Sequence, residues 1–328
     1  MSAVSSRLFL LLPLVGLVAA SRNAVRPTRR QFVGGSVAAA TCAPALPASA
    51  IVRGEDVSDA EAASAGVVGL YIDLTGCTIC RKGVPATCTG TLIAPNLVLS
   101  ARHCSDVPRE LNGTLEKVVF AADMLAPGAE SRYIEKIVST ADYGIETAGN
   151  DLLLIKIKGS APAPWRPVEL PLRLLPSQAE QKEAEQSGSP FYPSGIGMPA
   201  VVSYGYGQQT TEGEVDPSRY SAGQLKRIGL QVRTEVRPWA PGFLTTPLER
   251  QTGTCAGDSG GGALLGIGDP SGRGLRQVLL GVQAAATKPC VDNQAVFVYP
   301  QSFSEFLIKA SRDLGSPLQP GLSWRDFQ

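Results

Sequence analysis

Three residue types in this chain could together cleave an acyl bond: a serine, a histidine and an aspartate. Ser259 lies in the sequence Gly-Asp-Ser-Gly-Gly at residues 257–261, where small neighbours leave its hydroxyl accessible and let a substrate backbone come close. The chain has a single histidine, His103, so any imidazole chemistry must use it. Asp151 lies between the two. A histidine oriented by a carboxylate can take the proton of a serine hydroxyl and make it a nucleophile.

The order of these residues separates two classes of serine hydrolase. The motif Gly-x-Ser-x-Gly also fits the nucleophile elbow of α/β-hydrolases, and a glycine-rich turn without chemistry is a further interpretation. In α/β-hydrolases the histidine follows the serine, whereas His103 precedes Ser259 and no histidine comes after it. The order histidine, aspartate, serine is the one that this chain can supply.

Asp151 is the favoured carboxylate because it opens a strongly apolar segment. It is the second residue of Asn-Asp-Leu-Leu-Leu-Ile-Lys-Ile, residues 150–157. A turn residue without a catalytic role would fit the same place. The alternatives that lack such a context are Asp106, Asp123 and Asp142.

The elements that must position these residues are mostly short strands. From residue 51 onward, short apolar or alternating segments are separated by turn residues, and 35 Gly and 25 Pro favour strands and turns over long helices. The expected strands are 67–73, 89–94, 96–101, 117–122, 132–138, 151–158, 200–204, 224–232, 262–265, 277–283 and 295–299. A helix is expected at 302–310, with its apolar residues on one face.

The first fifty residues have the composition of a targeting sequence. They hold five arginines and no acidic residue, whereas the remainder has 25 basic and 29 acidic residues. An apolar stretch at 8–20 suits a signal-peptide core, and Arg29-Arg30 precedes a mild apolar run that ends in Ala-Ser-Ala at 48–50. We expect an extracytoplasmic protein, either in the thylakoid lumen of a plastid or secreted or periplasmic. A chance arginine pair in a long leader is the alternative.

Composition argues against several other classes of protein. A net charge of +1 gives no electrostatic case for nucleic acid, and the mature chain has no apolar run long enough for a transmembrane helix. Histidine is scarce and the cysteine pairs are widely separated, so no zinc site or other metal is expected, and no cofactor.

Several further motifs make the chain resemble the chymotrypsin/trypsin family of serine proteases from about residue 51 to 310. The sequences around the three catalytic candidates are similar to the family's catalytic motifs and occur in its order. Ile-Val-Arg-Gly at 51–54 resembles the mature N-terminus of the family. Cys-Thr-Gly-Thr-Leu-Ile at 88–93 resembles the segment before its histidine, and Val-Ser-Tyr-Gly-Tyr-Gly at 202–207 resembles the start of its second barrel.

The resemblance implies an all-β fold of two six-stranded antiparallel β-barrels with a C-terminal helix and the active site in the cleft between the barrels. The expected layout is a targeting leader at 1–50, a first barrel with its N-terminal segment at 51–160, a linker at 161–198, a second barrel and helix at 199–310, and a tail at 311–328.

The resemblance also implies a mechanism and a class of partner. The chain is expected to act on protein or peptide substrates, while its oligomeric state is not indicated. Ser259 would attack the scissile carbonyl, His103 would move the proton, and Asp151 would orient the imidazole. The amides of Gly257 and Ser259 would form the oxyanion hole.

Activation in this family uses a newly freed N-terminus, here Ile51, whose ammonium would pair with Asp258. Because Ala-Ser-Ala at 48–50 ends directly before Ile51, we expect the export peptidase itself to generate the active form. A short propeptide removed by another protease is the alternative.

The resemblance places Gly253 at the base of the primary specificity pocket and Ala286 and Ala295 on its walls. None of them carries a charge, and Glu249 lies outside the motif. We therefore expect cleavage after small to medium apolar residues rather than after arginine or lysine.

Two departures from the family pattern leave a second function open. Arg102 replaces a small residue, and Ala284 replaces a serine that usually contacts the catalytic aspartate. A less well supported Asp151 would lower activity. The alternative is a catalytically weak or inactive protease-like binding protein.

Six of the seven cysteines follow the leader, an even number that suggests disulfides in an exported chain. The resemblance implies the pairs Cys88–Cys104 and Cys255–Cys290. If they form, Cys77 and Cys80 remain, in a loop between the first two strands on the leaving-group side of the cleft. A local disulfide is expected there, with a redox switch as the alternative.

Overall fold

The computed structural model describes residues 51–80, 82–145, 150–172, 200–208, 222–233, 242–268 and 275–318, all within one unit of the chain. The expected targeting leader, most of the expected linker and the end of the expected tail lie outside these residues.

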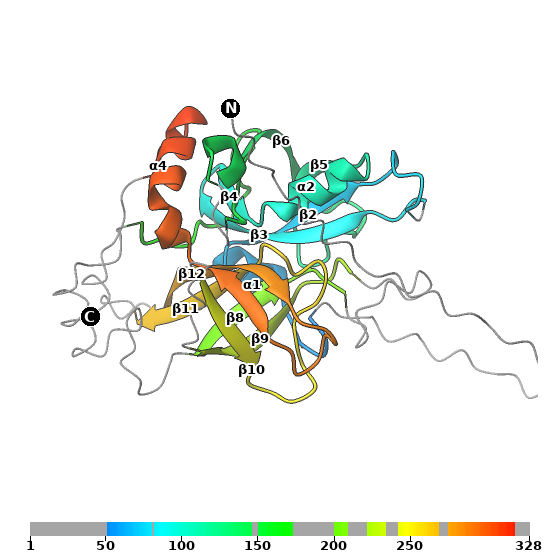
Figure 1. Cartoon of the computed structure of the whole chain (residues 1–328), viewed down its shortest axis with the longest axis vertical. Helices are drawn as coiled ribbons and strands as arrows, with labels where there is room; N and C mark the ends of the chain where they lie inside the picture. Colours follow the sequence, from blue (N-terminus) through cyan, green and yellow to red (C-terminus); the bar gives the residue numbers. More distant parts are fainter. Residues whose placement is uncertain are drawn as a thin grey trace, which may run out of the picture. The chain divides into compact units, whose positions relative to one another are not determined.

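The first half of the described chain forms a closed antiparallel barrel. Its strands follow the order β2-β3-β4-β7-β6-β5, and β5 pairs with β2 to close the ring (Figure 1, blue to green). Their bounds are β2 Val67–Asp73, β3 Ala86–Ala94, β4 Leu97–Ser100, β5 Thr114–Phe120, β6 Glu130–Ser139 and β7 Leu153–Ile157.

The second half forms another closed antiparallel barrel, in which β8 pairs with both β9 and β11. Its strands are β8 Ala200–Gly205, β9 Lys226–Arg233, β10 Gly242–Pro247, β11 Gly262–Gly268, β12 Leu275–Ala286 and β13 Ala295–Val298. The short β1, Glu55–Asp56, adds to the start of β9. The predicted fold of two six-stranded antiparallel barrels is therefore confirmed.

The sequence analysis did not predict β10, one of the strands of the second barrel. β10 lies between β9 and β13 and completes the second barrel. Its sequence Gly-Phe-Leu-Thr-Thr-Pro begins with glycine, ends with proline and lacks clear alternation, so local pattern does not reveal it. The neighbouring strands supply the pairing that makes it a strand.

Helices occupy the ends of the barrels rather than their walls. They are α1 Asp59–Ser64, α2 His103–Glu110 and α4 Ser304–Asp313, with 3₁₀ turns η1 Thr140–Tyr143 and η2 Pro300–Phe303. α1 was not predicted, although Ser58 caps it by accepting a hydrogen bond from the Glu61 amide, a serine-to-glutamate spacing typical of helix starts.

The C-terminal helix was predicted and runs three residues beyond the expected end. Ser311 and Leu314 are both buried, so the apolar face continues past Ala310 and keeps the chain helical. The ring of Phe306 meets that of Tyr143 at 5.2 Å between centroids, and the Tyr143 hydroxyl donates to Asp313 at 2.6 Å. The helix at the end of the second barrel thus packs on the first.

One apolar cluster joins the two barrels. It includes Leu99 from β4, Leu264 from β11, Val282 from β12 and Leu307 from α4, all nearly inaccessible to water. Each barrel also encloses a separate apolar cluster of its own. The shared cluster fixes one barrel against the other and so fixes the loops at their junction.

Candidate active site

His103 and Asp151 are brought together by strand pairing. β4 pairs with β7, with Ser100 opposite Leu153, so the residues just beyond these two positions emerge at the same edge. The Nδ1 atom of His103 lies 2.7 Å from Oδ2 of Asp151, and the backbone N–H of His103 donates to Oδ1 at 2.9 Å. A carboxylate only accepts, so Nδ1 carries the proton and Nε2 keeps a free lone pair.

The other aspartates considered from the sequence serve local structure. Each accepts a hydrogen bond from a neighbour on its own segment. The donors are Arg109 for Asp106, Leu125 for Asp123 and Ser139 for Asp142. Asp106 also forms an ion pair with Arg102. Of the four candidates, Asp151 is the one that contacts His103. The unusual Arg102 is directed to Asp106, at 2.9 Å.

Ser259 lies in a loop of two consecutive turns before β11. The Asp258 amide donates to the Cys255 carbonyl at 3.2 Å, and the Gly261 amide donates to the Asp258 carbonyl at 3.0 Å. Gly257 and Gly260 have φ values of +96° and +83°, which residues with a Cβ rarely adopt. These glycines allow the sharp path that leaves Ser259 partly exposed.

The loop is held against the first barrel next to the histidine. The Thr89 amide of β3 donates to the Ser259 carbonyl at 2.9 Å, and Sγ of Cys104 lies 3.7 Å from the same oxygen. A Cβ at Gly260 would lie 2.3 Å from the Thr89 carbonyl oxygen, so only glycine allows this approach. Since Cys104 follows His103 directly, the structure brings the Ser259 loop close to the histidine.

Thr89 joins the Ser259 loop to the first barrel, a contact that the sequence analysis did not predict. Its hydroxyl donates to the Gly257 carbonyl at 3.0 Å and accepts from the Tyr206 amide at 3.1 Å, while its own amide binds Ser259. Thr89 is fully buried at the junction of the barrels. Its place directly after Cys88 was the available signal, but nothing in the sequence shows that it reaches across the junction.

Two amides in the loop remain free. Among the described residues, neither the Gly257 nor the Ser259 N–H donates a hydrogen bond, although the amides of Asp258, Gly260 and Gly261 all do. Free donors beside a serine hydroxyl suit an oxygen that becomes negatively charged during acyl transfer.

Asp258 points inward rather than toward the cleft. It is completely buried, and its oxygens accept from the Cys255 amide at 2.7 Å and the Gly207 amide at 2.8 Å. Burial raises the pKa of Asp258 to about 7, although these two hydrogen bonds act in the opposite direction. Within the described residues, no cationic side chain pairs with it.

The predicted N-terminal segment is inserted into the second half of the molecule. Ile51 is fully buried among the apolar residues of the second barrel, and the Val52 amide donates to the Gly253 carbonyl at 3.0 Å. In this chain the Ile51 nitrogen is a peptide nitrogen, and the described contacts include no bond from it to Asp258.

Comparison with protein families settles the ancestry of this arrangement. The family model described as Trypsin matches residues 78–307, more than half of the chain. The chain belongs to the trypsin family. It is 27% identical to mouse (Mus musculus) neutrophil elastase over 177 residues, which is 53% of this chain and 57% of the elastase.

A solved structure supports the same fold. Human heparin binding protein matches with a TM-score of 0.54 and 19% identity, covering 83% of this chain and all of that one. At this identity the likeness concerns the fold alone. The chain spans less than two thirds of the elastase, so the activity of that relative does not transfer to it directly.

The three residues expected to line the specificity pocket belong to the second half of the described chain. Gly253 is buried, and a Cβ there would lie 2.4 Å from the Cys290 carbonyl oxygen and 2.6 Å from Oδ1 of Asn293. Ala286 of β12 lies opposite Ala295 of β13. No side chain at these three positions carries a charge. Glu249 is exposed.

The six cysteines of the described residues form three pairs at disulfide distance. Cys88–Cys104 joins β3 to the start of α2, Cys255–Cys290 joins the nucleophile loop to the segment before β13, and Cys77–Cys80 lies within one loop. The first two pairs thus hold segments on either side of the site.

Two kinds of feature are absent from the described residues. No group of His, Cys, Asp and Glu side chains there is arranged to hold a metal ion. No helix among them has the length and apolar character needed to cross a membrane.

Proposed function

We propose that the protein is a serine endopeptidase that hydrolyses peptide bonds through an acyl-enzyme. The observation that carries the proposal is the pair of hydrogen bonds between His103 and Asp151, which leaves Nε2 of His103 as the free base. The imidazole side chain is 36% exposed and therefore accessible to a substrate, and the Ser259 loop lies against Cys104, the next residue in the chain. Family membership supports protein substrates.

The reaction uses each group in turn. Nε2 of His103 takes the proton of the Ser259 hydroxyl as its oxygen attacks the scissile carbonyl carbon. The amides of Gly257 and Ser259 donate to the negatively charged oxygen of the tetrahedral intermediate. The protonated imidazole then gives its proton to the leaving amine, and water repeats the sequence to release the acid. Asp151 stays ionised and stabilises the imidazolium.

Activation would give Asp258 a cationic partner, the N-terminal ammonium of Ile51. A cut before Ile51 turns its nitrogen into an ammonium in the buried second half of the molecule, and Asp258 is a buried acid without a cation. Pairing the two would offset the cost of ionising Asp258. The resulting order in residues 257–259 would hold both oxyanion donors in place. We propose that the export peptidase makes this cut.

Specificity follows from the absence of charge at Gly253, Ala286 and Ala295. An uncharged pocket gains by burying apolar surface, so we propose cleavage after Ala, Val, Leu or Met rather than after Arg or Lys. A panel of peptides that differ only in the residue before the scissile bond tests this. A preference for arginine or lysine would contradict it.

The three cysteine pairs support a location in an oxidising compartment, because disulfides persist there. An extracytoplasmic location fits, either a thylakoid lumen or a secreted or periplasmic one. Sequencing the N-terminus of protein from its source tests both the location and the cut before Ile51. A mature N-terminus well upstream of Ile51 would contradict direct activation.

A weak or inactive protease-like binding protein is the second candidate, favoured by Ala284, which offers no hydroxyl to Asp151. A fluorophosphonate probe distinguishes the two, because it labels a serine only when the catalytic base is working. We expect the processed protein to be labelled and its Ser259→Ala variant to remain unlabelled. Processed, folded protein that resists the probe would favour the binding protein.

A further inference from the structure

The turn between α2 and β5 carries the sequence Asn-Gly-Thr at residues 112–114. An asparagine followed two positions later by serine or threonine is the acceptor sequence for N-linked oligosaccharides. Of the asparagines in the chain, Asn112 alone stands in this sequence; the others are Asn23, Asn96, Asn150 and Asn293. A modification would need both the asparagine amide and the threonine hydroxyl to be accessible.

Asn112 differs from the other asparagines that the structure describes. The side-chain amides of Asn96, Asn150 and Asn293 each donate a hydrogen bond, and none of these three residues is exposed. Asn112 is exposed, and its side-chain amide has no hydrogen-bond partner within the described parts of the chain. Its Nδ2 atom is therefore free to form a new bond.

The backbone of the turn is held against the barrel while the side chain of Asn112 is exposed. The Asn112 N–H donates to the Arg109 carbonyl at 3.1 Å, and the Gly113 N–H donates to the Pro108 carbonyl at 2.8 Å. On the other side, a Cβ at Gly76 would overlap the Asn112 carbonyl oxygen. The φ value of Asn112 is +56°, a conformation that asparagine adopts more readily than most residues. Exposed turns of this kind are where bulky, hydrated groups can be attached without disturbing a core.

The threonine of the acceptor sequence is accessible as well. Thr114 is the exposed first residue of β5, and its backbone pairs with that of Asp73 in β2. Its hydroxyl has no partner among the residues that the structure describes. Both groups that define the acceptor sequence are thus unoccupied on the surface of the folded protein.

We propose that Asn112 carries an N-linked glycan. The donor would be a lipid-linked oligosaccharide diphosphate of the endoplasmic reticulum. Nδ2 of Asn112 bonds to C1 of the first sugar as the bond from C1 to the phosphate oxygen breaks, so that the lipid diphosphate leaves and the amide gives up one proton. The apolar stretch at 8–20 is a suitable signal for entry into that compartment. The proposal does not rest on the proposed protease function, because no catalytic group takes part.

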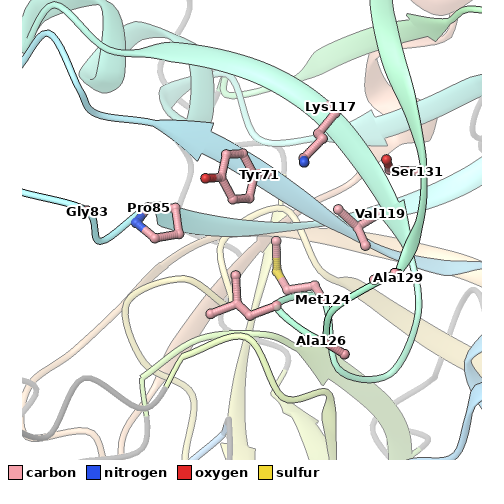
Figure 2. A pocket seen from close by; sticks show the side chains of 11 residues that line it. Tyr71, Gly83, Pro85, Lys117, Val119, Met124, Ala126, Ala129 and Ser131 are labelled. Carbon is pink, nitrogen blue, oxygen red and sulfur yellow. The ribbon is translucent and has the colours of Figure 1, made fainter.

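The glycan would lie away from the catalytic histidine and from the pocket on the first barrel. His103 opens α2, and a rise of about 1.5 Å per residue places Asn112 roughly 13 Å further along. The pocket, of about 410 Å³, is lined in part by Tyr71 and Lys117 (Figure 2). Lys117 lies three residues beyond Thr114 on β5, about 10 Å away. Loss of the glycan should therefore leave cleavage of a short peptide unchanged.

Peptide mass spectrometry of protein from its source tests the proposal. Trypsin releases residues 110–117, which contain a single asparagine, Asn112. We expect this peptide to carry an oligosaccharide, and a peptide N-glycosidase in ¹⁸O-water should convert it to the bare peptide with a labelled aspartate at 112. Deamidation of the Asn-Gly pair before the treatment would give an unlabelled aspartate, so the label distinguishes the two. A peptide found mostly with unmodified asparagine would overturn the proposal.

Variants of the full chain, secreted from a eukaryotic cell, assign the modification to this sequence. Asn112→Gln and Thr114→Val should both lose the oligosaccharide mass, whereas Thr114→Ser, which keeps the hydroxyl, should retain it. Asn96→Gln is the matched control and should retain it too, because Asn96 is outside any acceptor sequence. An oligosaccharide that survives Asn112→Gln would overturn the assignment.

Kinetics separate the glycan from the protease function. Asn112→Gln should cleave a short peptide within about twofold of the wild-type rate, as expected for a surface substitution. A glycosylated wild type that cleaves no peptide would support the glycan and contradict the protease. An active wild type with unmodified Asn112 would overturn the glycan alone.

Discussion

The two barrels contribute to the site in different ways. The first supplies His103 and Asp151 from the ends of paired strands, and two hydrogen bonds already join them. The second supplies Ser259 from a loop of turns whose shape depends on two glycines at positive φ and on the buried Asp258. Regular secondary structure builds the His103–Asp151 pair, whereas the Ser259 loop depends on a buried carboxyl group.

This difference between the barrels indicates that activity can be regulated through the Ser259 loop of the second barrel. Strand register changes only when the barrel unfolds, so the His103–Asp151 pair is present whenever the first barrel is folded. A loop held by one buried carboxylate can change with the protonation or pairing of that group. Processing at Ile51 is therefore expected to act on the second barrel alone.

Removing a catalytic group should have the largest effect and shows what each barrel contributes. Ser259→Ala should lower kcat by about 10⁶-fold, and Asp151→Asn by about 10⁴-fold, because the amide favours the wrong imidazole tautomer. Steady-state kinetics on a peptide substrate measure both, with circular dichroism as the control for folding. Near-normal turnover in Asp151→Asn would mean that a different carboxylate orients His103.

Blocking the N-terminus should have the second-largest effect on activity, through the second barrel. A chain processed to leave one extra alanine before Ile51 should lose about 10²–10³-fold in kcat, a loss comparable to that of one oxyanion donor. Asp258→Asn should give a similar loss. The His103–Asp151 pair should be unaffected, which the chemical shift of the His103 Nδ1 proton can report. Full activity with the added alanine would contradict the proposed pairing.

The cysteine pairs offer a comparison of stability across the barrels. Replacing both cysteines of a pair with alanine should lower the free energy of unfolding, because the unfolded chain regains loop-closure entropy. The expected loss is about 4 kcal/mol for Cys255–Cys290, about 3 kcal/mol for Cys88–Cys104 and about 2 kcal/mol for Cys77–Cys80. This order follows the sequence separations of 35, 16 and 3 residues. Urea unfolding measures them. Peptide mapping without reduction that finds Cys77 linked to Cys104 would contradict these pairings.

The unprocessed chain should also show a pH dependence of its stability. The pKa of Asp258 is about 7 in the folded chain and near 3.8 without burial, so between these values the folded state holds a proton that the unfolded state has lost. Its contribution to stability is therefore present at low pH and is lost as pH rises from about pH 4 to about pH 7, by on the order of 1 kcal/mol per pH unit. Urea unfolding of Ser259→Ala protein measures the slope, and adding Asp258→Asn should flatten it.

The sequence predicted those features that short segments determine. β2 has the expected bounds, and the pattern around Asp151 identified the carboxylate that binds His103, because apolar alternation and turn residues act locally. The sequence did not predict β10 or the role of Thr89. Both depend on partners more than 25 positions away in the chain: β10 on β13, and Thr89 on Gly257. Local pattern cannot specify such contacts, since tertiary packing selects them.

The packing of α4 on the first barrel has a consequence for the order in which the protein is made. Asp313 binds Tyr143, and Ser316 accepts from the Asn96 side-chain amide at 2.8 Å, so residues near the end of the described chain fasten a barrel synthesised long before them. A ribosome releases these residues only after both barrels have emerged. Until then the clamp between the barrels is incomplete. During most of its synthesis the chain therefore lacks the contacts that α4 makes with the first barrel, with His103 in one barrel and Ser259 in the other.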